Sequence, residues 1–191
     1  SQDELPQSAA GKTIMTTEPK FIPEKAVALT IDNNINFKVR LIDCVGYVVP
    51  SALGHTENDQ PRMVMSPWAE EAMPFNKAAE IGTEKVIKEH STIGLVITTD
   101  GSIGDIPRED YVEAEKRVIK ELKEINKPFV VILNTVYPKG EKAKELAASM
   151  QEEYGVPVMP IDCLSLSAGK INAIMQKILF EFPIQEIKIH L

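Results

Sequence analysis

Three short, uninterrupted apolar runs alternate with amphipathic stretches over the last two thirds of the chain, and this alternation restricts the fold more than any other feature. The runs are IGLVIT at 93–98, FVVIL at 129–133 and VPVMPI at 156–161. A strand that is covered on both faces reads as a continuous apolar run. We therefore expect an α/β fold with a mostly parallel sheet that is flanked by helices on both faces.

The stretches around these runs have apolar residues three to four positions apart, which is typical of helices that bury one face. The expected helices lie at about 75–90, 108–126, 139–154 and from Ser167 to about 182. Gly155 is a natural end for the third helix, and Ser167 is a natural cap for the fourth. In such sheets ligands bind where loops leave the carboxyl ends of the strands.

Two earlier apolar runs, AVALTI at 26–31 and FKVRLIDCV at 37–45, predict a β-hairpin. The segment DNNIN joins them, and its Asn33-Asn34 pair tolerates the positive φ that a tight turn needs. A long irregular stretch follows, up to residue 74. Loops of that length in a domain are usually functional or mobile.

The composition of the chain limits the classes of function that it can have. The chain has 191 residues, enough for one domain with a sizeable core, and a net charge of −7. That charge argues against broad nucleic-acid binding, which needs a basic face, but it allows a single bound nucleotide. Cys44 and Cys163 form no C-x-x-C pair, which favours a reduced, cytoplasmic protein. No apolar run approaches the ~20 residues that span a bilayer.

The segment PQSAAGKT at 6–13 ends with the letters of a phosphate-binding P-loop, G-x-x-x-x-G-K-[ST]. Lys12 and Thr13 fit this pattern, but Pro6 takes the place of the first glycine. Proline has no backbone N–H to point at a phosphate, and no apolar strand leads into the segment. We expect a polar loop here and not a P-loop.

The segment LIDCVGY places Asp43 and Gly46 at the end of the second hairpin strand. An aspartate at a strand end can hold Mg²⁺ through water. A glycine three residues later lets a backbone N–H approach a terminal phosphate and swing away when that phosphate leaves. The D-x-x-G pattern also simply ends strands, but its position before a long loop favours a phosphate-sensing role.

Thr16 and Thr17 lie in TIMTTEP, and two other polar segments follow buried strands. The two hydroxyls are able to close over a Mg²⁺–triphosphate, although composition alone reads as an ordinary loop. Asn134 ends a strand, where it would contact a purine or hold neighbouring loops together. The glycine-containing segment TTDGSIGDIP at 98–107 would contact a ligand, contact a neighbouring subunit or form a turn.

GTPases carry N-K-x-D where this chain has Asn134, Thr135, Val136 and Tyr137. The aspartate of that motif reads the N1–H and amino group of guanine. A site without this carboxylate loses its discrimination for guanine.

Four segments together resemble the stage IV sporulation protein A family, whose members are ATPases that form the basement layer of the bacterial spore coat. The segments are DELPQSAAGKTIMTTEPKF, RLIDCVGY, HSTIGLVITTDGSIGDIPRE and the strand that ends at Asn134. The resemblance extends over essentially all 191 residues. It implies a P-loop NTPase fold of the translation-factor-related, GTPase-like class that uses ATP and Mg²⁺.

The resemblance also implies roles for individual residues. Thr16 and Thr17 correspond to the sensor threonines of the family, and Asp43 corresponds to its Walker B aspartate. Thr17 and Asp43 are then the candidate metal ligands, with Thr16, Thr17 and Asp43 as the catalytic group. Gly46 corresponds to the switch glycine, and Asn134 with Thr135 lies at the base-contact position.

Family members hydrolyse ATP to drive self-assembly into a static polymer, on the mother-cell side of the forespore surface. The partners implied are further copies of the chain, coat proteins and a small amphipathic membrane-bound peptide. These contacts would lie largely outside this chain, so that any membrane association is indirect. No nucleic-acid partner is implied.

In the family, a strand, a P-loop and a helix precede this region, and this chain has none of them. We therefore expect residues 1–183 to form a partial ATPase domain and residues 184–191 to lead into a following domain. The chain by itself would bind ATP weakly, and its sheet would show a gap, a swapped strand or a rearrangement beside the strand that carries Asp43. Two alternatives stay open: a GTPase acting on ribosomes or membranes, and a non-catalytic interaction module.

Overall fold

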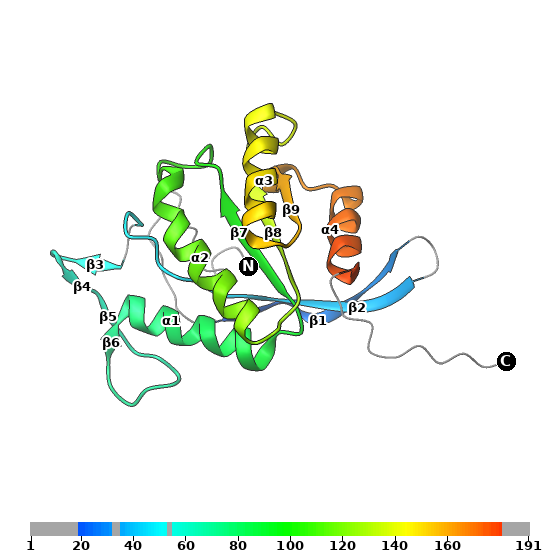
Figure 1. Cartoon of the computed structure of the whole chain (residues 1–191). Coiled ribbons are helices and arrows are strands. Elements are labelled where there is room, and N and C mark those ends of the chain that lie inside the picture. The colour runs from blue at the N-terminus through cyan, green and yellow to red at the C-terminus, as the bar shows by residue number, and fades with distance from the viewer. Residues whose placement is uncertain (1–18, 32–34, 53–54, 181–191) are drawn as a thin grey trace.

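The computed structural model of the chain describes residues 19–31, 35–52 and 55–180 (Figure 1). Two longer strands come first, followed by short strand pairs and then by alternating helices and strands. The strands are β1 Lys20–Ile31, β2 Ile35–Asp43, β3 Thr56–Glu57, β4 Gln60–Pro61, β5 Met63–Val64, β6 Met73–Pro74, β7 Gly94–Thr99, β8 Phe129–Asn134 and β9 Val158–Ile161. The helices are α1 Phe75–Lys85, continued by a π-helical turn Val86–His90, α2 Arg108–Glu124, α3 Glu141–Tyr154, a 3-10 turn Cys163–Ser165 and α4 Ala168–Phe180.

The strands β7, β8 and β9 form a parallel sheet in the order of the sequence. Gly94 pairs with Phe129 at one end, and Thr99 pairs with Asn134 at the other. Successive side chains of β8 point to opposite faces, so Val131 and Leu133 join the core under α2 and α3. The neighbouring Val130 and Ile132 pack against α4. The predicted α/β fold with helices on both faces of a parallel sheet is confirmed.

The strands β1 and β2 form the predicted antiparallel hairpin, with Ile31 paired to Ile35 and Lys20 paired to Asp43. The first strand is longer than expected, and the second has the expected length but begins and ends two residues earlier. The register shifts between Ile22 and Val27. The Asn33-Asn34 pair lies outside the described residues. The hairpin runs below the parallel sheet in Figure 1, and its Leu29 and Val39 pack into the core that α4 covers.

A mostly parallel sheet with a gap, a swapped strand or a rearrangement beside the strand of Asp43 was expected, and β2 is not part of the parallel sheet. Over the described parts of the chain, β2 pairs only with β1, and β7 pairs only with β8. The hairpin and the parallel sheet are therefore separate, and β7 lies at an edge. Ile97, in the middle of β7, is 60% exposed although its strand reads as fully buried. A discontinuity beside β2 agrees with a strand belonging there, and the identity of that strand stays a prediction.

The predicted helices are confirmed. In α2, Glu115 and Ile119 are buried, whereas Ile125 just after the helix is exposed. In α4, Ile174, Met175 and Ile178 are buried, and Ile171 is exposed. Gly155 ends α3 in the left-handed region at φ 63°, as predicted.

The long stretch after β2 is packed against the rest of the molecule over its first part. Val49 and Ala52 are buried in a cluster with Phe75, Ala79 and Ile106, which come from α1 and the loop before α2. We call residues 44–52 the post-β2 segment. It is therefore docked between α1 and α2. None of the helices in the described residues is long and apolar enough to cross a membrane.

Candidate nucleotide site

The carboxyl ends of β7 and β8 are joined by a network of short polar contacts. Thr135 donates its hydroxyl hydrogen to Asp100 at 2.5 Å, and Ser102 donates to the other carboxylate oxygen at 2.5 Å. The backbone N–H of Val136 donates to the Ser102 hydroxyl at 3.1 Å, and that of Tyr137 donates to Thr135 at 3.1 Å. This network fixes the two loops relative to each other.

Thr135, a predicted cofactor contact, has no exposed surface, and its hydroxyl is occupied by Asp100 and Tyr137. Its observed contacts therefore hold the two loops together. A contact from this side chain to a nucleotide would require the network to open, and the predicted role of Thr135 as a cofactor contact stays a prediction.

Thr135→Val is expected to lower the free energy of unfolding by about 1.5–3 kcal/mol. Valine has nearly the same shape as threonine but cannot donate the buried hydrogen bond to the Asp100 carboxylate. Burial acts to raise the pKa of Asp100, but the Ser102 and Thr135 hydrogen bonds lower it further than burial raises it. The stabilisation is thus present above the ordinary aspartate pKa and is lost as pH falls through the lowered folded-state pKa. The variant should lose less stability over that acidic range.

Urea denaturation at several pH values measures both effects. Thr92→Val, at an exposed threonine before β7, is the matched control and should change stability by under about 0.5 kcal/mol. If the two substitutions changed the free energy of unfolding equally, the polar network would not stabilise the fold as predicted.

Asn134 ends β8 next to the loop that follows β9. Its side-chain oxygen accepts the backbone N–H of Cys163 at 3.0 Å, so one of the two roles expected for it, holding neighbouring loops together, is observed. The loops on its two sides carry exposed apolar side chains: Tyr137 is 70% exposed and Leu164 is 89% exposed. Contact of Asn134 with a base stays a prediction.

Asp43 is the last residue of β2 and is half-buried. Burial raises the pKa of its carboxyl above the ordinary value, and a hydrogen bond from the Cys44 backbone N–H offsets part of this effect. Within the described residues no group of three His, Cys, Asp or Glu side chains is placed to hold a metal. One carboxylate suits Mg²⁺, which commonly binds through one or two carboxylates, waters and substrate phosphates.

Gly46 has φ +79°, and a Cβ placed there would meet no atom within 4 Å. The glycine is required by its backbone conformation and not by crowding. Its backbone also hydrogen-bonds Cys44, and its role as a switch glycine stays a prediction.

The predicted residues form two groups. Asp43 and Gly46 lie at the end of the hairpin, and Asn134 and Thr135 lie at the end of the parallel sheet. Within the described residues, no hydrogen bond or ion pair joins these two groups. Thr16 and Thr17 lie outside the described residues, so their predicted approach to Asp43 stays a prediction.

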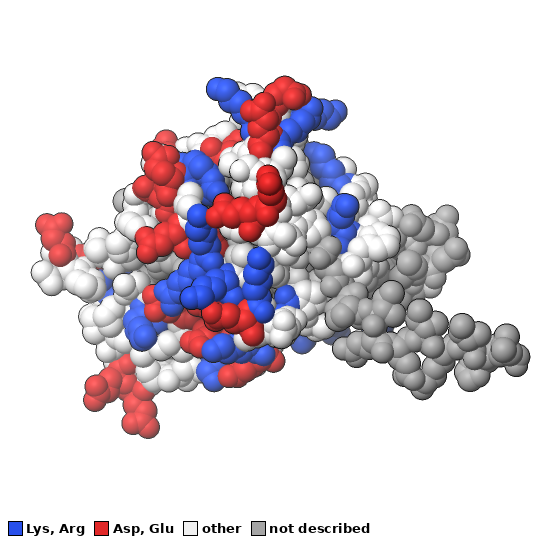
Figure 2. Space-filling view, viewed as in Figure 1, with Lys and Arg blue, Asp and Glu red and all other residues white. Residues whose placement is uncertain are grey.

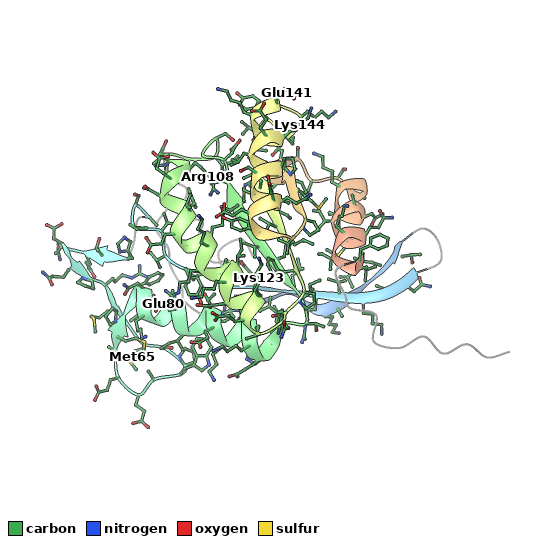
Figure 3. All side chains as sticks on the ribbon, in the orientation of Figure 1. Met65, Glu80, Arg108, Lys123, Glu141 and Lys144 are labelled. Atoms are coloured by element: carbon green, nitrogen blue, oxygen red, sulfur yellow. The ribbon has the colours of Figure 1, made fainter. Side chains whose placement is uncertain are left out.

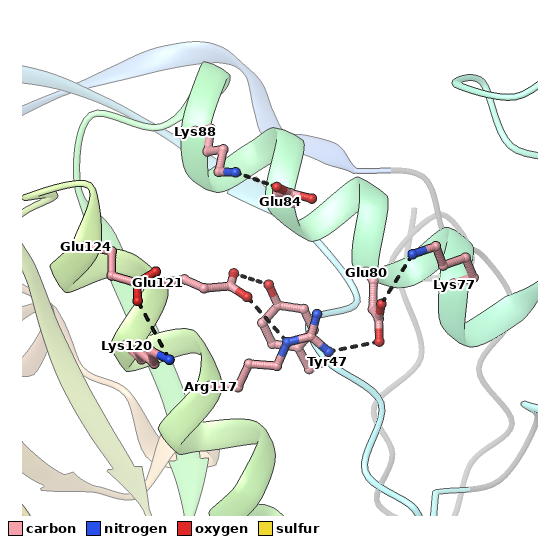
Figure 4. Close-up of polar contacts among 9 residues, drawn as sticks. All are labelled: Tyr47, Lys77, Glu80, Glu84, Lys88, Arg117, Lys120, Glu121 and Glu124. Atoms are coloured by element: carbon pink, nitrogen blue, oxygen red, sulfur yellow. Dashed lines mark hydrogen bonds and ion pairs between the residues drawn. The ribbon is translucent and has the colours of Figure 1, made fainter.

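Sequence reasoning missed a polar cluster around Tyr47, the residue after Gly46 (Figure 4). Its hydroxyl donates to Glu121, and the guanidinium carbon of Arg117 lies 4.0 Å from the ring centroid. Arg117 also pairs with Glu80 on α1 at 2.8 Å and with Glu121 at 3.3 Å. We call Tyr47, Arg117, Glu80 and Glu121 the Tyr47 clamp. No local signal points to it, because its members are up to 74 residues apart.

The surface around the clamp carries both signs of charge. Figure 2 shows Lys and Arg side chains interspersed with Asp and Glu over α1, α2 and α3, with no continuous basic area on this face. In Figure 3, Glu80 lies on α1 and Lys123 lies on α2, at the same side of the molecule. On the face shown, acidic side chains lie among the basic ones, as the net charge of −7 leads one to expect.

The parallel sheet with helices on both faces, and the D-x-x-G segment after β2, are compatible with a domain of the P-loop NTPase class. The family model for the stage IV sporulation protein A ATPase domain matches residues 1–183. The chain belongs to the stage IV sporulation protein A family, as its sequence motifs indicated.

Its relatives agree over the whole chain. It is 54% identical over 191 residues to stage IV sporulation protein A of Bacillus anthracis, 51% to that of Bacillus subtilis (strain 168) and 52% to that of Clostridioides difficile (strain 630). The chain spans 39% of the length of each of these proteins. No solved structure matches it.

Proposed function

We propose that this chain is part of an ATP-binding, ATP-hydrolysing structural protein that self-assembles into the basement layer of the bacterial spore coat, on the mother-cell side of the forespore surface. The observation that carries the proposal is the match of the ATPase-domain model to residues 1–183. Its expected partners are further copies of the chain, coat proteins and a small amphipathic membrane-bound peptide.

Asp43 and Gly46 are proposed to act at the terminal phosphate. The Asp43 carboxylate, with its raised pKa, lies half-buried beside the Cys44 N–H and would gain from a cation. It would hold Mg²⁺ through water, together with the Thr17 hydroxyl. Bound Mg²⁺ neutralises charge on the phosphates. The Gly46 N–H is proposed to contact the γ-phosphate, with Thr16 as a second sensor.

The base is proposed to lie at the loops after β8 and β9. Asn134 would contact it, between the exposed Tyr137 and Leu164 side chains, which offer an aromatic and an aliphatic surface for a flat ring. Tyr137 takes the position at which guanine-reading sites carry an aspartate. The absence of that carboxylate favours ATP over GTP.

The cradle for the inner phosphates is proposed to come from a P-loop outside this chain, with its strand between β2 and β7. The separation of the two sheets and the exposure of Ile97 support this placement. A helix following that strand would cover Ile97.

Competition binding tests the proposal. ATP is expected to displace a fluorescent ATP analogue from the full-length protein at about 10-fold or more lower concentration than GTP. The 191-residue chain is expected to bind about 100-fold or more weakly than the full-length protein, because a lost phosphate cradle costs several charge-assisted hydrogen bonds. Equal displacement by GTP would contradict the ATP assignment, and a micromolar dissociation constant for the short chain would contradict the missing cradle.

A further inference from the structure

The Tyr47 clamp lies directly beside the glycine to which we assign phosphate sensing. Tyr47 follows Gly46 in the chain, and its half-buried ring is covered by Arg117 and bonded to Glu121 (Figure 4). Burial and the neighbouring Glu121 carboxylate raise the pKa of the Tyr47 hydroxyl well above its ordinary value, so the hydroxyl stays protonated and remains a donor. It is therefore committed to Glu121.

Arg117 connects this ring to two helices. It lies on α2, and its ion pair with Glu80 reaches α1 at 2.8 Å. Its second ion pair, with Glu121 at 3.3 Å, is one turn along α2 and includes the carboxylate that Tyr47 contacts. Glu80 is held in turn by Lys77 at 4.0 Å. Movement of the Tyr47 ring would therefore disturb contacts on both helices.

The backbone is held differently on the two sides of Tyr47. Before it, Gly46 has a φ of +79° and no atom within 4 Å of the position that a Cβ would take, and its backbone hydrogen-bonds Cys44. Beyond Tyr47, the buried Val49 and Ala52 anchor the chain, and Ser51 donates to Asp110 on α2. Rotation of the Gly46 peptide is thus opposed by its contact with Cys44 and by the Tyr47 ring.

We propose that Arg117 is a positioning residue for the phosphate-sensing glycine: by holding Tyr47 against α2 it sets the direction of the Gly46 N–H, and it transmits displacement of that glycine to α1 and α2. This inference rests on the proposed function. A phosphate that draws the Gly46 N–H toward it pulls Tyr47 within the clamp, and the ion pairs of Arg117 convert that pull into a change between the two helices.

Cys44 offers a direct readout of the post-β2 segment. It is partly buried, next to Asp43 and two residues from Gly46. Because the thiol is partly covered, it is expected to react slowly with alkylating reagents while the segment is docked. Its alkylation rate therefore measures release of the segment, independently of turnover.

The experiment compares full-length wild type, Arg117→Met and the control Lys120→Met. Lys120 lies on the same helix in an exposed ion pair with Glu124 at 3.7 Å, and it does not contact Tyr47. Iodoacetamide labelling of Cys44 is followed by peptide mass analysis with and without ATP, and kcat and KM for ATP are measured on the same samples.

Arg117→Met is expected to lower kcat about fivefold or more with KM within about twofold, because the lost interaction acts after ATP is bound. The ATP-dependent change in Cys44 labelling that is expected of the wild type should disappear. Lys120→Met should match the wild type in all three measurements. If Arg117→Met does not fold, Tyr47→Phe replaces it, with basal Cys44 labelling expected to rise about twofold or more.

The outcomes separate the two proposals. Wild-type protein that neither hydrolyses ATP nor changes its Cys44 labelling with ATP would overturn the proposed function and this inference with it. Wild-type protein that does both, while the Arg117 or Tyr47 variant behaves identically, would overturn the inference alone. A merely structural clamp would lower thermal stability but leave the ATP-dependent change in Cys44 labelling intact, which would also overturn it.

Discussion

Full-length protein with Asp43→Asn is expected to lose about 100-fold in kcat for ATP while keeping its thermal stability. The first effect follows because the amide carries no negative charge to hold Mg²⁺ at the phosphates. The second follows from the raised pKa of Asp43: burial disfavours its ionised form, so a neutral side chain of the same size is not penalised in the folded state.

The raised pKa of Asp43 also predicts how the stability of the protein changes with pH. Because the folded-state pKa of Asp43 is raised, the protein without nucleotide loses stability as pH rises through that pKa, and Asp43→Asn should remove this loss. ATP turnover and thermal unfolding at several pH values measure the two effects. Asp59→Asn, at an exposed position with φ 59° that asparagine tolerates, is the matched control. Undiminished turnover in the Asp43 variant would show that Asp43 does not hold the Mg²⁺ that catalysis needs.

Arg108→Met is expected to lower the free energy of unfolding of this chain by about 3–5 kcal/mol, since it leaves a buried carboxylate without its cation. Arg108 is at the first turn of α2 (Figure 3), and it contacts both oxygens of Glu115 at 2.7 and 2.8 Å. The Glu115 side chain is only 1% exposed, and the Tyr154 hydroxyl also donates to it at 2.5 Å.

At acidic pH, the difference in the free energy of unfolding between the wild type and Arg108→Met should become smaller. Burial acts to raise the pKa of Glu115, but hydrogen bonds from Arg108, Thr98 and Tyr154 bring it below the ordinary value. The stabilisation is therefore present above the ordinary glutamate pKa and is lost as pH falls through the lowered folded-state pKa. In Arg108→Met this carboxylate should instead favour its protonated form.

Urea denaturation from neutral pH downward tests this prediction. The control is Lys116→Met: Lys116 on α2 pairs at 2.7 Å with Glu153 on α3, but both side chains are about half exposed. Its loss should cost under about 1 kcal/mol. The double variant Arg108→Met with Glu115→Gln should recover part of the stability. Similar costs for Arg108→Met and Lys116→Met would show that burial of Glu115 does not set the size of the effect.

Periodicity predicted the fold class because it reports a local property. Continuous apolar runs identified β7, β8 and β9, and Gly155 identified the end of α3. The same reasoning failed for Glu115, because a glutamate among charged residues of a helix reads as solvated until a partner such as Arg108 is placed beside it. It also left open how β2 is arranged beside the parallel sheet, since strand patterns do not specify which strands pair.

Some residues of the candidate site were also predicted from the sequence, and others were seen only in the structure. Asp43 and Gly46 were found because strand ends and glycines leave a short-range signal. The buried state of Thr135 was not found, because its partner Asp100 follows a different strand. The Tyr47 clamp was not found for the same reason.

By itself, the order of residues determined the α/β class, the Asp43 to Gly46 pattern at the end of β2 and the lack of a guanine-reading carboxylate at Tyr137. Each of these depends on neighbours along the chain. Only the tertiary structure decided that the hairpin is separate from the parallel sheet, that Thr135 is internal and that Arg117 covers Tyr47. Those features depend on which distant elements pack together, because a side chain's partner, burial and charge environment are set by the packed elements around it.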